Sequence, residues 1–286
     1  MPNSDSMVRP ALFAGQWYPE DPAECRRAIE EYGEAARGRG AYRGLVSPHA
    51  GWLYSGAAAG CGFATLAQAA RSAEVVVVFG SHRSAAGPNS VFRGDAWDTP
   101  LGPIENATDL ADELAGGLAL EDEPVFPRRP DNGIELQLPF VRHFFPEARL
   151  LALGVAAAPI ALEIGRWVGR VLAEHEVAAA VVASTDLTHY GPSYGLVDHG
   201  TGEAAARWVR DVNDRGFIDR VLAADAAGSL EHAERNASAC CPGAVAAAIE
   251  TLRASGHVPA PDLADHYLSY DVEPHSSFVG YAAILL

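Results

Sequence analysis

The fold is decided by the stretch Val75-Val76-Val77-Val78-Phe79-Gly80-Ser81-His82, an apolar run that ends in glycine, serine and histidine. A second run, Ala178–Ser184, has the same character. Both runs are apolar at successive positions, so both faces of each strand must be buried, as in a sheet covered by helices on each side. Amphipathic segments alternate with such strands along the chain. The sequence therefore predicts one α/β domain over residues 1–286.

The expected elements follow from the period of the apolar residues. Strands are expected over Gly44–Ser47, Glu74–Gly80, Arg149–Val155, Ala178–Ser184 and Phe278–Leu286. Helices are expected over Ser55–Arg71, Thr108–Leu118, Pro159–Glu174, Gly202–Ala224 and Pro242–Ser255. A further helix should open at the capping box Asp21-Pro22-Ala23-Glu24 and run to about Arg37. Asn89–Glu105 is typical of a hairpin that turns at Thr99-Pro100-Leu101-Gly102.

The charge balance excludes several kinds of chemistry. The chain has 286 residues with 37 acidic and 21 basic side chains, and every basic residue is arginine. Without lysine there is no Schiff-base mechanism, no phosphate-loop lysine and no kinase-type ion pair. A net charge of −16 argues against a nucleic-acid-binding surface. Catalysis must therefore use other side chains.

Segments that would direct the chain to a membrane or to secretion are not expected. Met1 to Val8 lacks the basic start and apolar run of a signal peptide. The longest apolar stretch, Leu150 to Leu162, is too short for a membrane span. The 4 cysteines do not form a disulfide framework. We expect a cytoplasmic protein with reduced thiols.

Histidines follow three of the predicted strands. His49 comes shortly after Gly44–Ser47, His82 follows Val75–Gly80, and His189 lies a few residues beyond Ala178–Ser184. Ligands of open α/β sheets bind outside the carboxyl ends of the strands, so these side chains should converge on one site. Histidine is the commonest metal ligand and the usual acid/base near neutral pH. For a single histidine, a hydrogen-bonded loop residue is the competing interpretation.

Two adjacent cysteines, Cys240 and Cys241, precede a helix that opens at Pro242. A thiolate there is stabilised by the helix dipole and by free N–H groups, which suits a metal ligand or a nucleophile. The alternative is a small buried apolar residue, and this is the interpretation we favour for Cys25 and Cys61. Spacing alone leaves both alternatives open for Cys240 and Cys241.

The ordered blocks of the chain resemble the Memo family over nearly its whole length. The blocks are Val8-Arg9-Pro10, Ala14-Gly15-Gln16-Trp17-Tyr18-Pro19, Ser47-Pro48-His49-Ala50-Gly51-Trp52-Leu53-Tyr54-Ser55-Gly56, Gly80-Ser81-His82, Thr99-Pro100-Leu101-Gly102, Glu135-Leu136-Gln137-Leu138-Pro139-Phe140, Ser184-Thr185-Asp186-Leu187-Thr188-His189 and Phe278-Val279-Gly280-Tyr281-Ala282. The resemblance implies a mixed, mostly parallel sheet flanked by helices, similar to that of class III (LigB-type) extradiol dioxygenases.

The resemblance also implies a site. The two histidines and one cysteine that build the family's metal site match His49, His82 and Cys240. His189 matches the acid/base histidine of the related dioxygenases, and Asp186 stands three residues before it. Trp17 and Tyr54 match residues that line the same cleft.

Two positions depart from the family pattern. Asp131-Asn132-Gly133 stands where the family has Glu-His-Ser, so Asn132 can only donate or accept hydrogen bonds there. Cys241 replaces the glycine that follows the ligand cysteine, which is why Cys240 rather than Cys241 is matched to the metal. Cys241 is then either a redox partner of Cys240 or a tolerated small residue.

Three functional hypotheses follow. The first is an Fe(II) enzyme, with copper also admitted and zinc less favoured, that oxidises a small chelating phenolic or oxygen-rich substrate with O₂. The second is a non-catalytic metal- or peptide-binding protein with a vestigial cleft. The third is hydrolysis, by Zn²⁺-activated water or by Cys240 as nucleophile with His189 and Asp186. The sequence leaves open the substrate, the native metal and the oligomeric state.

Overall fold

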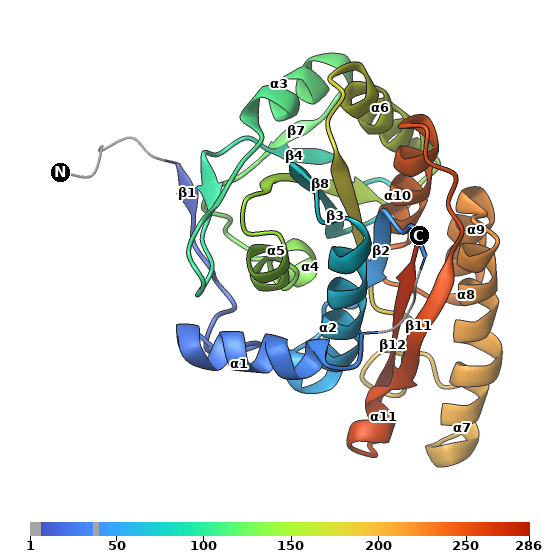
Figure 1. Ribbon diagram of the computed structural model, residues 1–286. Coiled ribbons are helices and arrows are strands. Elements are labelled where there is room, and N and C mark those ends of the chain that lie inside the picture. Colours follow the sequence, from blue (N-terminus) through green and yellow to red (C-terminus); the bar gives the residue numbers. More distant parts are fainter. Residues whose placement is uncertain (1–6, 37–39) are drawn as a thin grey trace.

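A mixed β-sheet forms the centre of the molecule, in a computed structural model that describes residues 7–36 and 40–286 (Figure 1). Among these residues, its nine strands are β2 (Gly44–Ser47), β3 (Val75–Arg83), β4 (Ser90–Phe92), β7 (Glu121–Glu123), β8 (Arg149–Ala156), β9 (Ala179–Ser184), β10 (His189–Tyr190), β11 (Asp262–Leu268) and β12 (Phe278–Leu285). They lie in the order β10-β12-β2-β9-β3-β8-β4-β7, and β11 also pairs with β12. A separate small sheet contains β1 (Val8–Arg9), β5 (Ala96–Trp97) and β6 (Ile104–Glu105).

The centre of the large sheet is parallel. β2 and β3 both run parallel to β9, and β8 runs parallel to β3. On either side the sheet turns antiparallel, with β12 against β2 and β4 against β8. The expected α/β class with a mixed sheet is therefore confirmed. Because β2, β9 and β3 are neighbours with one direction, their carboxyl ends meet at one edge.

Helices cover both faces of the sheet (Figure 1). They are α1 (Pro22–Gly33), α2 (Trp52–Ala69), α3 (Thr108–Gly117), α4 (Asn132–Glu135), α5 (Leu138–Phe144), α6 (Ile160–Glu174), α7 (Gly202–Trp208), the π-helical segment η1 (Val209–Asp214), α8 (Arg215–Leu222), α9 (Ala226–Asn236), α10 (Pro242–Ala254) and α11 (Ser269–Val272).

Alternate residues of the central strands belong to two separate cores. Val76 and Val78 pack with α1, α2 and α5 on one face. Val75, Val77 and Phe79 pack with α3, α6 and α10 on the other. This alternation follows from the two-residue period of a strand, and it explains why the run Val75–Phe79 is apolar throughout.

Most expected elements are present with ends shifted by a few residues, as is usual for helix and strand termini. The helix expected from Ser55 begins earlier, at Trp52. The helix that opens at Pro22 is capped by Asp21, whose Oδ1 accepts from the N–H groups of Ala23 and Glu24. It ends at Gly33, and its expected end at Arg37 lies outside the described residues.

Three expectations need correction. The strand expected to stop at Gly80 continues to Arg83, so His82 lies within β3 rather than after it. The helix expected over Gly202–Ala224 ends at Leu222 and contains the π-helical segment η1 in its middle. The expected hairpin exists only as β5 and β6, which pair around the Thr99–Gly102 turn, because β4 joins the large sheet instead.

The position of α10 is fixed by close packing against α6. A Cβ atom at Gly165 would lie only 2.3 Å from the carbonyl oxygen of Ala247, so only glycine allows the two helices to approach this closely. The start of α10 carries Cys240 and Cys241. The contact therefore fixes where these two thiols lie relative to the sheet.

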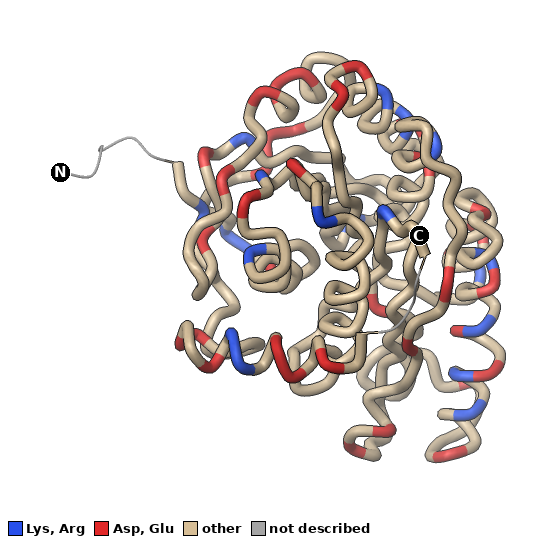
Figure 2. Tube along the Cα trace, viewed as in Figure 1, with Lys and Arg blue, Asp and Glu red and all other residues tan. Residues whose placement is uncertain are grey.

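Charged residues lie mainly on the outer elements. Figure 2 shows acidic and basic residues interspersed along the outer helices and loops, whereas β2 and β9 carry neither. Within residues 7–36 and 40–286, every helix is too short or too polar to cross a membrane.

Candidate metal centre

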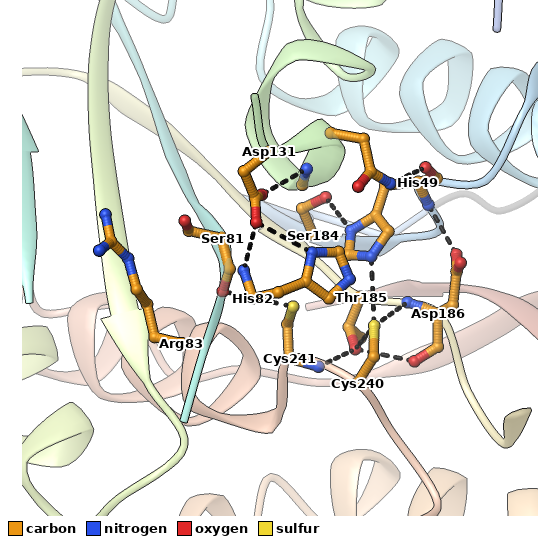
Figure 3. Close-up of polar contacts among 12 residues, drawn as sticks. His49, Ser81, His82, Arg83, Asp131, Ser184, Thr185, Asp186, Cys240 and Cys241 are labelled. Carbon is orange, nitrogen blue, oxygen red and sulfur yellow. Dashed lines mark hydrogen bonds and ion pairs between the residues drawn. The ribbon is translucent and has the colours of Figure 1, made fainter. Parts of the chain in front are cut away.

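The edge where β2, β9 and β3 end carries a cluster of potential metal ligands. His49, His82, Cys240 and Cys241 each offer one ligand atom, and these atoms all lie within 4.8 Å of one another. His49 follows β2, His82 lies near the end of β3, and the cysteines precede α10 (Figure 3). The structure thus brings together the three residues matched to a metal site by resemblance, with Cys241 as an additional neighbour.

His49 is buried, and both of its ring nitrogens have defined partners. Its Nδ1 lies 2.9 Å from Ser184 Oγ, at the end of the neighbouring strand β9. Gln137 Nε2 donates to the same oxygen at 3.0 Å. The Nε2 atom lies 3.1 Å from Cys240 Sγ. When Nδ1 donates to Ser184, Nε2 presents its lone pair towards the cluster, which is the tautomer a metal requires.

A β-bulge turns His82 into the site. Gly80 pairs with Gly154 and Arg83 with Ala156, so Ser81 and His82 oppose one residue of β8. Ser81 adopts a left-handed backbone with φ of 76°, which is unfavourable for a residue with a side chain. Because the bulge changes the alternation of β3, the strand continues while the His82 side chain faces the cluster.

Asp131 orients the His82 ring. One oxygen, Oδ2, accepts from the His82 backbone N–H at 2.9 Å and lies 3.1 Å from His82 Nδ1. The other oxygen accepts from the Gly133 N–H at 2.8 Å and caps α4 (Figure 3). Nε2 is therefore the ring nitrogen of His82 that remains for a ligand. A carboxylate–histidine pair of this kind is the usual support of a metal-bound imidazole.

The two cysteines differ in their surroundings. Cys240 Sγ accepts the Asp186 backbone N–H at 3.3 Å, in addition to its contact with His49. Cys241 is buried, and its thiol donates to the Ser81 carbonyl at 3.4 Å. Cys240 thus accepts hydrogen bonds as a thiolate does, whereas Cys241 has an acceptor for its proton.

The pKa values of Cys240, His49 and His82 are all shifted in favour of the charged form of the side chain. Burial raises the pKa of Cys240, but the Cys241 thiol and the imidazoles of His49 and His82 outweigh burial and hold it well below its usual range. The hydrogen bond to Asp131, together with that to Cys240, raises the pKa of His82 to about 10. Burial lowers the pKa of His49, yet Cys240 and Asp186 outweigh it and raise the value. The cluster therefore favours a thiolate compensated by positive charge, a role that a divalent cation fills.

Asp186 connects the cluster to His189. Its Oδ1 accepts the His49 backbone N–H at 2.7 Å, and its Oδ2 lies 3.8 Å from His189 Nε2. That Nε2 is buried and has no hydrogen-bond partner among the described residues. Burial lowers the pKa of His189, but Asp186 and Cys240 outweigh it and raise the value. His189 therefore has a ring nitrogen available to a bound molecule.

A cleft of about 740 Å³ opens beside the cluster. His82, Asp186 and His189 contribute to its floor and walls, and Trp17 and Tyr54 line it as the resemblance implies. Asn132 lines it as well, and its Nδ2 donates to the His49 carbonyl at 2.8 Å. The volume suits a small molecule rather than a macromolecule.

Some residues of the site were missed by reasoning from sequence. Asp131 and Ser184 orient the two imidazoles, and Tyr194 and Glu273 line the cleft. Ser184 carried a weak signal, since it ends a buried strand at the same edge as His49. Asp131 and Glu273 carried none, because their roles depend on contacts with elements far away in the sequence.

Contacts of the Cys240 thiol bear on the hydrolysis hypothesis. Among the described residues its imidazole neighbours are His49, at 3.1 Å, and His82, both in the ligand cluster. His189, which that hypothesis pairs with Cys240, instead has its Nε2 atom 3.8 Å from Asp186 Oδ2. The thiol is thus placed as a member of a ligand set.

The chain is similar to known proteins over its full length. The family model described as "Memo-like protein" matches residues 9–285. A MEMO1 family protein of Methanopyrus kandleri is 33% identical and covers 98% of this chain and 99% of its own. One from Methanothermobacter thermautotrophicus is 30% identical, with 96% and 99% covered. An uncharacterized Escherichia coli protein of known crystal structure is similar with a TM-score of 0.44 and 16% identity, over 74% of this chain and 85% of that one.

Proposed function

Because this chain belongs to the Memo family, we propose that it is a non-haem metalloprotein that binds Fe(II), with copper as an alternative, through His49, His82 and Cys240. In this proposal it catalyses an O₂-dependent, dioxygenase-like oxidation of a small chelating substrate. The substrate is phenolic or otherwise rich in oxygen. Both atoms of O₂ enter the substrate, so no external reductant is needed.

The observation that carries the proposal is the orientation of the two imidazoles. Ser184 engages Nδ1 of His49 and Asp131 engages Nδ1 of His82, so both Nε2 atoms are left for a ligand beside Cys240. Two imidazoles and a thiolate are a donor set that suits iron, copper and zinc. Three protein ligands would leave coordination positions free for other molecules. The residues present therefore fit the metal that the family resemblance implies.

A bound metal would supply a positive centre at which a chelating substrate and O₂ meet. Side chains of the protein would bind the substrate and move its proton. His189 Nε2, which is buried and has no hydrogen-bond partner among the described residues, would take the proton of a substrate hydroxyl and later return it. Asp186, 3.8 Å away, would stabilise the resulting imidazolium and hold the ring in place. Trp17 and Tyr54 would pack against the substrate and exclude water.

Oxygen uptake tests the proposal. The protein is reconstituted with Fe(II) without oxygen, mixed with a panel of catechols, and exposed to O₂. We expect uptake with at least one catechol, loss of both metal and uptake in Cys240→Ser, and loss of uptake with retained metal in His189→Ala. His175→Ala, which alters an exposed histidine paired with Glu113, should behave as the native protein. Full metal loading without uptake for every catechol would contradict the enzymatic proposal.

A second candidate, a non-catalytic metal-binding protein, is favoured by one observation. Cys241 lies within 4.8 Å of the other three ligand atoms, so four donors could close the site around zinc. Against this, the Cys241 thiol already donates to Ser81. Alkylation of the thiols with and without metal distinguishes the two candidates. The enzymatic proposal predicts that metal slows the alkylation of Cys240 far more than that of Cys241. A closed four-ligand site predicts that metal slows both equally.

A further inference from the structure

The cleft is lined by carboxylates and imidazoles, and among the described residues by no permanently charged cation. Asp186 and Glu273 contribute carboxylates, and among the described residues no arginine lines it. The chain has no lysine at all. The other ionisable groups around the cleft are histidines and tyrosines. A negatively charged group inside the cleft would therefore find imidazoles but no guanidinium or ammonium group to pair with.

The nearby arginines belong to a different pocket. Arg83, Arg128 and Arg129 line a pocket of about 260 Å³ that shares only His82 with the cleft. Arg83 Nη2 is already paired with Glu123 at 2.5 Å. None of these three arginines lines the cleft.

Glu273 is an exposed residue of the cleft lining, and we call the solvent-facing part of the cleft around it the mouth. It follows α11 directly, and its Oε2 accepts from the Tyr54 hydroxyl at 3.2 Å. Among the described residues it forms no ion pair with an arginine or histidine. Its carboxylate is thus held against the cleft wall with its charge uncompensated.

Aromatic rings surround the same opening. Trp17 and Tyr194 are 38% and 48% exposed, which is high for large aromatic side chains, and both line the cleft with Tyr54. The faces of such rings attract ammonium groups and disfavour anions. The Glu273 carboxylate and the aromatic rings therefore both favour a positively charged group in the cleft.

We infer that the cleft selects a chelating aromatic substrate whose side chain ends in a protonated amine, as in a catecholamine. This inference rests on the proposed function and specifies its substrate class. The hydroxyl groups lie at the cluster beside His189, and the ammonium group lies at the mouth between Glu273 and the aromatic rings. A carboxylate in the same position meets Glu273 and is repelled.

Three catechols with side chains of similar length test the inference: dopamine, which is cationic, 4-ethylcatechol, which is neutral, and 3-(3,4-dihydroxyphenyl)propionate, which is anionic. Each is titrated anaerobically into the Fe(II)-loaded protein, and binding is followed by calorimetry and absorption. We expect dopamine to bind most tightly and the anionic catechol most weakly, with about a tenfold difference in Kd at low ionic strength. The difference should shrink as salt is added, because the mouth is exposed to solvent.

Two variants test whether the charge of Glu273 causes this difference in affinity. Glu273→Gln keeps the size of the side chain and removes its charge, so it should reduce the difference between dopamine and the anionic catechol roughly threefold, mainly through weaker dopamine binding. Glu163→Gln, at an exposed position of α6, removes one charge outside the cleft lining and should leave all three affinities unchanged.

Failure of this inference differs from failure of the proposed function. If all three catechols bind equally well, or the anionic one binds best, the charge selection is overturned and the proposed function stands. An unchanged preference in Glu273→Gln would also overturn the role given to that carboxylate. If no catechol binds the Fe(II)-loaded protein, the proposed function fails and this inference fails with it.

Discussion

Asp131 holds the His82 imidazole in its orientation. Its carboxylate binds both the backbone N–H and Nδ1 of His82. Asp131→Asn retains an oxygen that can cap α4 but loses the charged acceptor for the imidazole. Loss of such a partner typically weakens metal binding about 10- to 100-fold. We expect a decrease of that size, measured by competition with a chromophoric chelator.

The exposed Asp198 provides the matched control, since Asp198→Asn removes the same charge away from the cluster. Its metal affinity should equal that of the native protein. An Asp131→Asn variant with native affinity would show that the carboxylate does not support a ligand.

Protons and metal compete for the same atoms. Asp131 and Cys240 raise the pKa of His82 to about 10, so without metal this ring is protonated at neutral pH. A ligand must be deprotonated, so metal binding releases this proton and the affinity rises as the pH increases towards 10. We expect a gain on the order of tenfold per pH unit for this proton between pH 6 and 8. Calorimetry in buffers of different ionisation enthalpy measures the released protons; an affinity independent of pH would contradict the expectation.

Among single residues, the sequence predicts the proposed metal ligands better than the residues that orient them. The strand-end positions of His49 and His82 and the helix-start position of Cys240 indicate a shared site, and the resemblance to the Memo family is what singles out these three as its ligands. Asp131 could not, because its role arises only when the start of α4 packs against β3.

Among the elements, the bulge in β3 is a strained segment placed next to a ligand. Ser81 has φ of 76°, where glycine is comfortable and β-branched residues are not. We expect Ser81→Gly to change the free energy of unfolding by less than about 1 kcal/mol, and Ser81→Val to destabilise by about 2 kcal/mol or more. Urea denaturation of the metal-free proteins measures both. A valine variant as stable as the glycine variant would contradict a left-handed Ser81.

The π-helical segment η1 anchors the loop that carries His189. Asp214 is fully buried there, lies 3.1 Å from His266 Nε2, and accepts the Thr188 N–H at 3.1 Å. Gly280 leaves room for this carboxylate, since a Cβ there would lie 2.0 Å from Asp214 Oδ2. π-Helical turns often occur where a side chain must be redirected.

Removal of this carboxylate should be costly. Asp214→Ala leaves His266 and the Thr188 N–H without their acceptor, so we expect a loss of about 3 kcal/mol of stability. Asp211→Ala, at an exposed position of the same segment, should change stability by less than about 0.5 kcal/mol. Thermal and urea denaturation measure both variants; equal stability of the two would contradict an anchoring role for Asp214.

Helices and strands could be predicted where the segment itself carries a regular pattern of apolar residues. The strand over Gly44–Ser47 and the helix from Thr108 follow from burial and period alone. The bulge at Ser81 and the π segment were not predictable, because the period of the apolar residues carries no signal for either departure from regular geometry.

At the scale of the whole molecule, the cluster joins distant parts of the chain. Its residues come from β3, from the segment after β2 and from the start of α10, so a bound metal would connect two strands of the sheet with a helix that covers it. A ligand that binds only the folded state at 100 times its Kd adds about 2.7 kcal/mol of stability. We expect a corresponding rise in Tm on metal addition, and no rise in Cys240→Ser.

The single α/β domain was predictable from the apolar runs, because strands buried on both faces require helices on both sides. The charge of the cleft was not predictable. Glu273 reaches Tyr54 only after the carboxy-terminal strands have folded back onto β2, and nothing local in its sequence indicates this contact.

The most direct test of the central claim is the metal content of protein purified without a chelating tag, measured by elemental analysis beside Cys240→Ser. The account predicts about one iron per chain, or copper in its place, in the native protein, and almost none in the variant. Zinc alone, or equal metal in both proteins, would contradict an iron site built on His49, His82 and Cys240.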